Sequence, residues 1–141
     1  MDDDELKRRL YHEYTHVLLR YLARDNIPWW FNEGTAQLMS EDYEESDENR
    51  VKRAFEQERL FALKMLEENQ LQKLDPERIR VAYAQSHATV AFLYGRFGKP
   101  RFLRFLNILG NGTEPEQALR QVYRRDYDEL YDELQRDISR N

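Results

Sequence analysis

The chain has 141 residues, of which 40% are hydrophobic, so it can bury one core and we expect a single domain over residues 1–141. A formal net charge of −5, with basic residues spread among acidic ones, provides no basic surface for nucleic acid, and the absence of cysteine excludes disulfides and thiolate metal sites. No apolar run approaches the roughly 18 residues of a membrane span and the start of the chain is acidic, so a soluble protein without signal peptide or membrane partner is expected. Neither the cellular compartment nor the oligomeric state is indicated.

The first predicted helix covers about residues 3–23, with its acidic residues at the N-terminal end, where the helix dipole favours them. Leu19 and Ala23 lie beside two histidines of this helix. A second side carries the stripe Leu6, Leu10, Tyr14, Val17 and Tyr21. Because a helix that is apolar on several sides is usually surrounded by others, we expect this one to be central in the fold.

The same helix contains an H-E-x-x-H motif, made by His12, Glu13 and His16. At about 100° per residue, the two histidines share one face and both imidazoles can reach one metal ion. Glu13 lies beside them, where a base must be to take a proton from water. Two imidazoles and a carboxylate suit zinc. The alternative is a chance motif, with these three side chains exposed on a polar helix face.

A second predicted helix begins at Pro28 and ends at Met39 or Ser40. It contains Glu33, which follows His16 by seventeen positions, enough for the rest of one helix, a turn and the start of the next. Catalytic zinc sites use three protein ligands and leave a fourth position for water, so Glu33 is the candidate third ligand.

Together, His12-Glu13-x-x-His16 and the segment Trp30-Phe31-Asn32-Glu33-Gly34-x-Ala36 resemble the gluzincin metallopeptidases, and more narrowly the peptidase MA-like group and its aminopeptidase relatives. The resemblance implies that Glu33 is the third zinc ligand. It also implies that Tyr83, in the sequence Tyr83-Ala84-Gln85-Ser86, donates a hydrogen bond to the oxyanion of the tetrahedral intermediate. The alternative is an ordinary core tyrosine, since the chain has nine tyrosines.

Gluzincins normally place a β-sheet ahead of the H-E-x-x-H helix, whereas eleven residues precede His12 here and no later segment alternates like a strand. We therefore predict an all-α, single-domain helical bundle that resembles the helical catalytic part of gluzincins, with the upstream β-sheet absent. A natural small enzyme, a trimmed fragment and a designed or minimal version of the site all fit this pattern.

Further helices follow from periodicity and capping residues. Ser46 is a predicted N-cap for a helix over residues 47–57, residues 61–69 have a helical pattern, and Asp75-Pro76 opens a long helix that ends at Phe97. A helix over residues 100–109 follows. Capping boxes open the last two helices, one made by Thr113 with Glu116 and one by Asp126 with Glu129.

Several side chains near the motifs have more than one interpretation. His87, one turn beyond Tyr83, could support the site, act as a donor near the metal, or be a hydrogen-bonded core residue. Gln37, one turn beyond Glu33, could hold a ligating histidine in its correct tautomer. We expect Asn32 and Gly34 to serve local geometry, and Trp29, Trp30 and Phe31 to serve packing.

The sequence thus predicts a zinc-dependent hydrolase, in the first place a peptidase, that acts on a peptide or a small ester or amide. His12, His16 and Glu33 would bind Zn²⁺, Glu13 would be the general base, and Tyr83 would stabilise the oxyanion. One alternative is a helical module in which the metal is structural, for example with His87 as a fourth ligand. A second is a designed or trimmed metal-site scaffold with little activity. A third is an interaction protein that retains the motif without metal.

Overall fold

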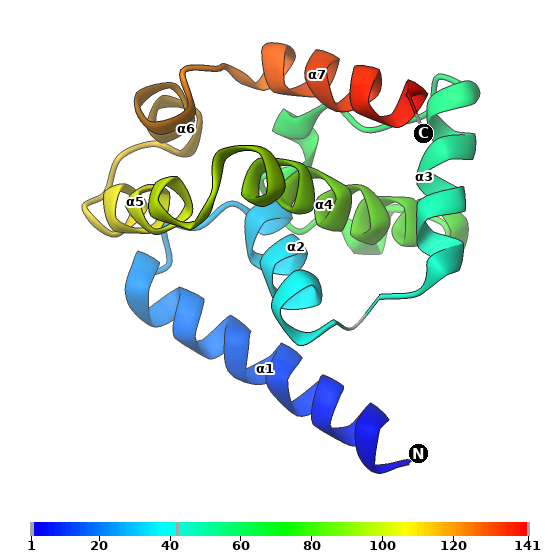
Figure 1. Cartoon of the computed structure of the whole chain (residues 1–141), viewed down its shortest axis with the longest axis horizontal. Coiled ribbons are helices and arrows are strands. Elements are labelled where there is room, and N and C mark those ends of the chain that lie inside the picture. Colours follow the sequence, from blue (N-terminus) through cyan, green and yellow to red (C-terminus); the bar gives the residue numbers. More distant parts are fainter. Residues whose placement is uncertain (1, 42, 141) are drawn as a thin grey trace.

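The structure, a computed structural model, describes residues 2–41 and 43–140. These residues form seven α-helices and two 3₁₀ helices and contain no β-strand, which confirms the all-α prediction (Figure 1). The α-helices are α1 (Asp3–Ala23), α2 (Trp29–Ser40), α3 (Glu45–Glu56), α4 (Pro76–Phe97), α5 (Lys99–Gly110), α6 (Pro115–Tyr123) and α7 (Tyr127–Ser139). The 3₁₀ helices are η1 (Leu63–Leu66) and η2 (Leu71–Lys73).

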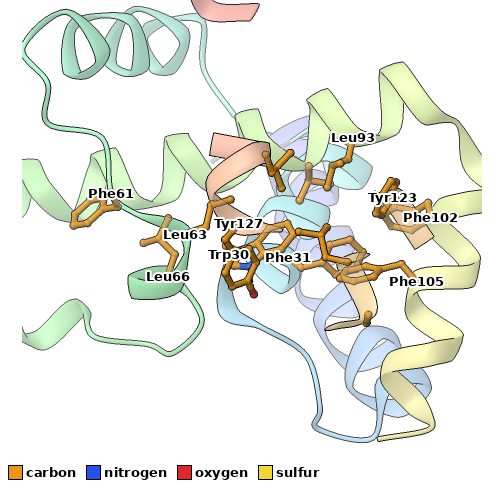
Figure 2. Packing of buried hydrophobic residues seen from close by; sticks show 14 of the residues in the cluster. Trp30, Phe31, Phe61, Leu63, Leu66, Leu93, Phe102, Phe105, Tyr123 and Tyr127 are labelled. Atoms are coloured by element: carbon orange, nitrogen blue, oxygen red, sulfur yellow. The ribbon is translucent and has the colours of Figure 1, made fainter. Parts of the chain in front are cut away.

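Helices α2 and α4 pack against each other at the centre of the fold, and α3, α5 and α7 each contact α4 (Figure 1). The start of α2 is anchored by Trp30 and Phe31, both fully buried among aromatic side chains that include Phe102 and Phe105 (Figure 2). Burial of such large aromatic side chains contributes much of the stability of a small core. Because Trp30 and Phe31 point into the core, the rotation of α2 is set, and with it the direction of Glu33.

Close contact between α2 and α4 depends on Gly34. A Cβ at this position would lie 2.3 Å from the backbone oxygen of Ser86 and 2.5 Å from Cγ2 of Val90. Both distances are far below van der Waals contact, so only glycine permits the two backbones to approach this closely. The residue next to Glu33 therefore determines how near α2 lies to the helix that carries Tyr83.

Helix α1 lies at the edge of the molecule, where it contacts α2 and α5 (Figure 1). Its buried residues are His16, Leu19 and Ala23, all on one side. The stripe made by Leu6, Leu10, Tyr14, Val17 and Tyr21 is exposed. The prediction that this helix is central was therefore wrong, because only one of its two apolar sides finds a partner among the described residues.

Most predicted helix ends agree with the structure, and the differences occur at caps. Asp75 caps α4 by accepting from the backbone N–H of Arg78, and Asp126 with Glu129 forms the predicted capping box of α7. Pro28 is the N-cap of α2 and not its first residue. Two other predicted N-caps, Ser46 and Thr113, were wrong.

At α3 the N-cap is Glu44, whose backbone N–H donates to Asp47 at 3.1 Å, and Ser46 lies inside the first turn. At α6 the carboxylate of Glu114 accepts from the backbone N–H groups of Glu116 and Gln117. At α6 Glu114 thus supplies the acceptor that Thr113 was expected to provide, and at α3 Glu44 and Asp47 form a capping box in place of a Ser46 cap.

Residues 61–69, predicted to be helical, form only the 3₁₀ helix η1, with extended chain before it and a bend after it. The amide of Gln85 binds both backbone groups of Phe61, with Oε1 accepting at 2.8 Å and Nε2 donating at 2.7 Å. This clamp holds the chain extended before η1, while Leu63 and Leu66 are buried. Leu63 and Leu66 are three residues apart, which suits a 3₁₀ helix because residues i and i+3 then share one face.

No helix among the described residues has the length and apolar character needed to cross a membrane.

Candidate metal centre

Helices α1 and α2 bring His12, His16 and Glu33 together. The Nε2 atom of His12 lies 3.5 Å from Oε2 of Glu33, and Nε2 of His16 lies 3.4 Å from Oε1 of the same carboxylate. The three potential ligand atoms all lie within 4.8 Å of one another, and the three side chains are largely but not fully buried. The sequence-predicted triad is thus assembled by one turn of α1 and the second turn of α2.

These distances suit a tetrahedral cation. With metal–ligand bonds of about 2.0–2.1 Å, two ligand atoms of a tetrahedral zinc site lie about 3.4 Å apart. The Oε2 atom of Glu33 is buried and accepts no well-directed hydrogen bond from the described part of the chain. A cation between the three side chains would satisfy this oxygen, so the donor set and its spacing fit zinc.

Asn32 fixes the orientation of His16. Its Oδ1 atom lies 2.6 Å from Nδ1 of His16 and accepts the proton of that nitrogen. The Nε2 atom, which faces Glu33, is then left with its lone pair available for a metal. The sequence prediction assigned only local geometry to Asn32, and the one signal that could have indicated this role is its position immediately before Glu33.

Glu33 and His16 each favour the charged form of the other. Burial opposes ionisation of Glu33, but in the metal-free protein the neighbouring imidazoles of His12 and His16, when their Nε2 atoms carry a proton, outweigh it and lower the pKa of Glu33 to about 2. The hydrogen bond with Glu33 raises the pKa of His16, against the effect of burial, with further support from Asn32 and from the negative charge of Glu13. The carboxylate is therefore ionised throughout the physiological pH range, as a metal ligand must be.

Glu13 and Tyr83 both interact electrostatically with residues of the triad. Glu13 is exposed, and its charge acts on both His16 and Tyr83. Burial, together with the negative charges of Glu33 and Glu13, raises the pKa of Tyr83, so its phenol is neutral and able to donate. The ring of Tyr83 packs edge-on against Trp29, with ring centroids 5.2 Å apart.

An open cleft of about 740 Å³ lies beside Tyr83. Its walls come from the N-terminal half of α1, the start of α3 and the start of α4, and include Arg9, Tyr43, Arg50 and Arg80. A cleft of this size is within the usual range for the binding of small molecules and peptide side chains. It gives a ligand access to the region around Tyr83.

Comparison with protein families matches residues 4–140 to the Peptidase MA superfamily. The chain belongs to this superfamily. Among curated proteins and among solved structures no match was found. Membership confirms the resemblance to the peptidase MA group that the motifs of α1 and α2 indicated, and it suggests a function of the metallopeptidase type.

In this peptidase MA protein, Gln37 does not hold a ligating histidine, and that interpretation was wrong. Its Nε2 atom donates to the backbone oxygen of Tyr83 at 3.1 Å and to that of Glu33 at 3.4 Å. The side chain is buried, and both acceptors lie on the peptide backbone. Gln37 therefore links the backbone of α2 at Glu33 to the backbone of α4 at Tyr83.

His87 lies apart from the triad. Its ring stacks on Tyr43 with centroids 4.1 Å apart, and its buried Nε2 atom has no hydrogen-bond partner in the described part of the chain. Burial lowers the pKa of His87, partly opposed by the charges of Asp47 and Glu48 on α3. Within the described residues, the cluster of potential metal ligands contains His12, His16 and Glu33 and no fourth histidine, cysteine or carboxylate.

Proposed function

We propose that this protein is a zinc-dependent peptidase. The observation that carries the proposal is the convergence of His12, His16 and Glu33 within 4.8 Å, with Glu13 exposed one residue along the same helix. Membership of the Peptidase MA superfamily supports the reaction class. We assign Zn²⁺ to the triad because two imidazoles and one carboxylate, with no sulfur ligand, are typical of catalytic zinc.

When bound, zinc would lower the pKa of water and polarise the substrate carbonyl. Glu13 would accept the proton of the attacking water and deliver it to the nitrogen of the leaving amine. Its exposure suits this role, because a base that exchanges protons with water and substrate must reach the open side of the site.

Tyr83 would donate a hydrogen bond to the oxygen on which negative charge develops. Its raised pKa keeps the proton on the phenol, and Trp29 limits the movement of its ring. Asn32 would keep His16 in the tautomer that binds metal, and Gln37 would hold the backbones of Glu33 and Tyr83 at a fixed separation.

The substrate would be a peptide or a small ester or amide, bound in the cleft beside Tyr83. A structural metal site, the rival function, requires a closed set of four protein ligands. The described residues supply three, and His87 faces Tyr43 and α3 instead. This difference favours a site with a position left for water.

The test is hydrolysis of a library of quenched fluorescent peptides by the zinc-loaded protein, with and without a chelator, alongside Glu13→Gln. We expect chelation to abolish turnover, and Glu13→Gln to lose turnover while it retains one zinc per chain by elemental analysis. Glu56→Gln, an exposed glutamate on α3, is the matched control and should retain both. Full activity in Glu13→Gln, or turnover that a chelator does not affect, would refute the proposal.

A further inference from the structure

The cleft beside Tyr83 continues the face of α1 that carries the metal cluster. On a helix with about 100° per residue, Arg8 lies about 40° round α1 from His12, and Arg9 lies about 20° from His16. Both arginines line the cleft, one and two turns before the respective histidines. A substrate held at the metal cluster and extending into the cleft therefore passes these two side chains.

Arg80 reaches the same cleft from α4, three residues before Tyr83, which also lines it. Three residues of a helix rise about 4.5 Å, and the four residues between Arg8 and His12 rise about 6 Å. Each residue of an extended peptide spans at most about 3.6 Å. A substrate group one or two residues from a bond held between the metal and Tyr83 is therefore within range of Arg8 and Arg80.

Four arginines line the cleft, and two of them already have acidic partners in its wall. Arg9 donates to Glu5 at 3.2 Å, and Arg50 donates to Asp47 at 2.8 Å. All four of these side chains line the cleft, so their charges largely cancel within it.

The other two arginines, Arg8 and Arg80, have a positive charge available. Arg8 forms no ion pair with any residue that the structure describes. Arg80 lies 3.7 Å from Glu77, which also accepts from Arg50 at 3.2 Å, so one carboxylate faces two guanidinium groups. The side chains of Arg80 and Glu77 are 60 and 57% exposed, and a surface pair of this kind contributes little stability. Arg80 can therefore turn to another anion at little cost.

The remaining acidic residues of the cleft are Glu41 and Glu44. Glu44 accepts from the hydroxyl of Ser46 at 3.1 Å, at the start of α3. Glu41 follows Glu33 by eight positions, or about 12 Å along α2. Arg8 and Arg80 thus lie closer along their helices to His12 and Tyr83 than Glu41 lies to Glu33. The part of the cleft next to the reactive groups favours a negative charge.

We propose that the cleft selects substrates with a carboxylate one or two residues from the scissile bond, and that Arg8 and Arg80 bind this carboxylate. The inference rests on the proposed peptidase function and names its substrate class. Guanidinium groups bind carboxylates through two parallel N–H···O bonds, which fixes the position of the bound group as well as its charge. The carboxylate belongs to an aspartate or glutamate side chain or to the C-terminus of the peptide.

Matched pairs of peptides test the preference in the wild type. One pair is blocked at both ends and carries glutamate or glutamine within two residues of the scissile bond. The other pair has no charged side chain and ends in a free or an amidated C-terminus. We expect kcat/KM to be about 10-fold or more higher for the carboxylate member of at least one pair, and that pair identifies the source. Equal kcat/KM values within both pairs would overturn the proposal.

Variants assign the preference to the two arginines. Arg8→Gln and Arg80→Gln should each lower the ratio of kcat/KM values within the preferred pair about 3- to 10-fold, whereas Arg80→Lys keeps the charge and should retain most of it. Arg8→Glu combined with Arg80→Glu should prefer a peptide with lysine at that place. The matched control is Arg104→Gln, an exposed arginine on α5, which should keep the wild-type ratio. A ratio that survives Arg8→Gln combined with Arg80→Gln would overturn the proposal, with circular dichroism melts to show that each variant folds.

Binding separates this inference from the proposed function. Zinc-loaded Glu13→Gln, which should not cleave the peptides, should bind each pair with the same preference in isothermal titration calorimetry. Cleavage without a preference for the carboxylate would overturn this inference and leave the proposed function intact. A binding preference that the arginine variants lose, in a protein that cleaves no peptide, would refute the proposed function and support the carboxylate site.

Discussion

The side-chain oxygen of Asn32 lies 2.6 Å from Nδ1 of His16 and so determines which imidazole nitrogen faces the metal cluster. Asn32 immediately precedes Glu33, which means that one turn of α2 supplies both a ligand and the residue that orients another ligand. Loss of a hydrogen bond that orients a metal-binding histidine typically reduces metal affinity about 10- to 100-fold.

We therefore expect Asn32→Ala to bind zinc about 10- to 100-fold more weakly than the wild type, as measured by competition with a chelating dye. Asn32→Asp, which retains an acceptor oxygen at the same place, should bind zinc at least as tightly as the wild type. Equal affinities in Asn32→Ala and the wild type would show that the hydrogen bond does not orient the ligand.

Gly34 and Gly95 provide a pair of opposite predictions. A Cβ at Gly34 would lie 2.3 Å from the backbone oxygen of Ser86, whereas a Cβ at Gly95 would meet nothing within 4 Å. Gly34→Ala should lower the free energy of unfolding by about 2 kcal/mol or more, because α2 must move away from α4. Gly95→Ala should raise it by about 0.5–1 kcal/mol, because alanine favours the helix. Urea denaturation of the metal-free variants measures both, and a destabilised Gly95→Ala would contradict the open space at that position.

Much of the site could be predicted because it depends on residues that are close together in the sequence. The spacing of His12 and His16 places both imidazoles on one helical face wherever α1 packs. The ends of α4 and α7 could be predicted for the same reason, since Asp75 and Asp126 bind backbone groups three residues away. The spacing made Glu33 a candidate and the resemblance assigned it as a ligand, because its approach to the histidines depends on how two helices cross.

The errors concern contacts between distant segments. Gln37 lies one turn beyond Glu33, but its partners include a backbone oxygen on α4, 46 positions later in the chain. The clamp of Gln85 on Phe61, which keeps residues near 61 extended, likewise spans 24 positions. Periodicity identified both apolar sides of α1 without indicating that one would lack a partner. A pattern shows which side chains avoid water, whereas the surrounding structure decides what they contact.

Tyr83 gives a prediction for catalysis that separates it from an ordinary core tyrosine. Tyr83→Phe should lower kcat by about 100-fold, because it removes one donor to the oxyanion, and should change zinc affinity little. Tyr94→Phe, a half-buried tyrosine further along α4, is the matched control and should retain the wild-type kcat. Equal kcat values in Tyr83→Phe and the wild type would leave Tyr83 with a packing role only.

The pH dependence of this effect follows from the raised pKa of Tyr83. Burial and the charges of Glu33 and Glu13 favour the neutral phenol, so its proton is retained beyond the ordinary value of 10.0. The ratio of wild-type kcat to that of Tyr83→Phe should therefore be constant from neutral pH to about pH 10. Steady-state rates across this range test it, and a ratio that falls below pH 10 would show that the phenol ionises earlier than its surroundings imply.

His87 predicts how stability changes in mild acid. Burial lowers its pKa below 6.5, and the charges of Asp47 and Glu48 oppose this effect only in part. The unfolded chain therefore takes up a proton near pH 6.5 that the folded protein resists, and the stability that neutral His87 permits is lost as pH falls below 6.5. In metal-free protein, His87→Gln should lose less stability than the wild type between neutral pH and about pH 5. Urea midpoints measure the difference, from which the titration of His12 and His16 cancels because both proteins contain them. Identical pH profiles would show that His87 titrates in the folded protein as it does in the unfolded chain.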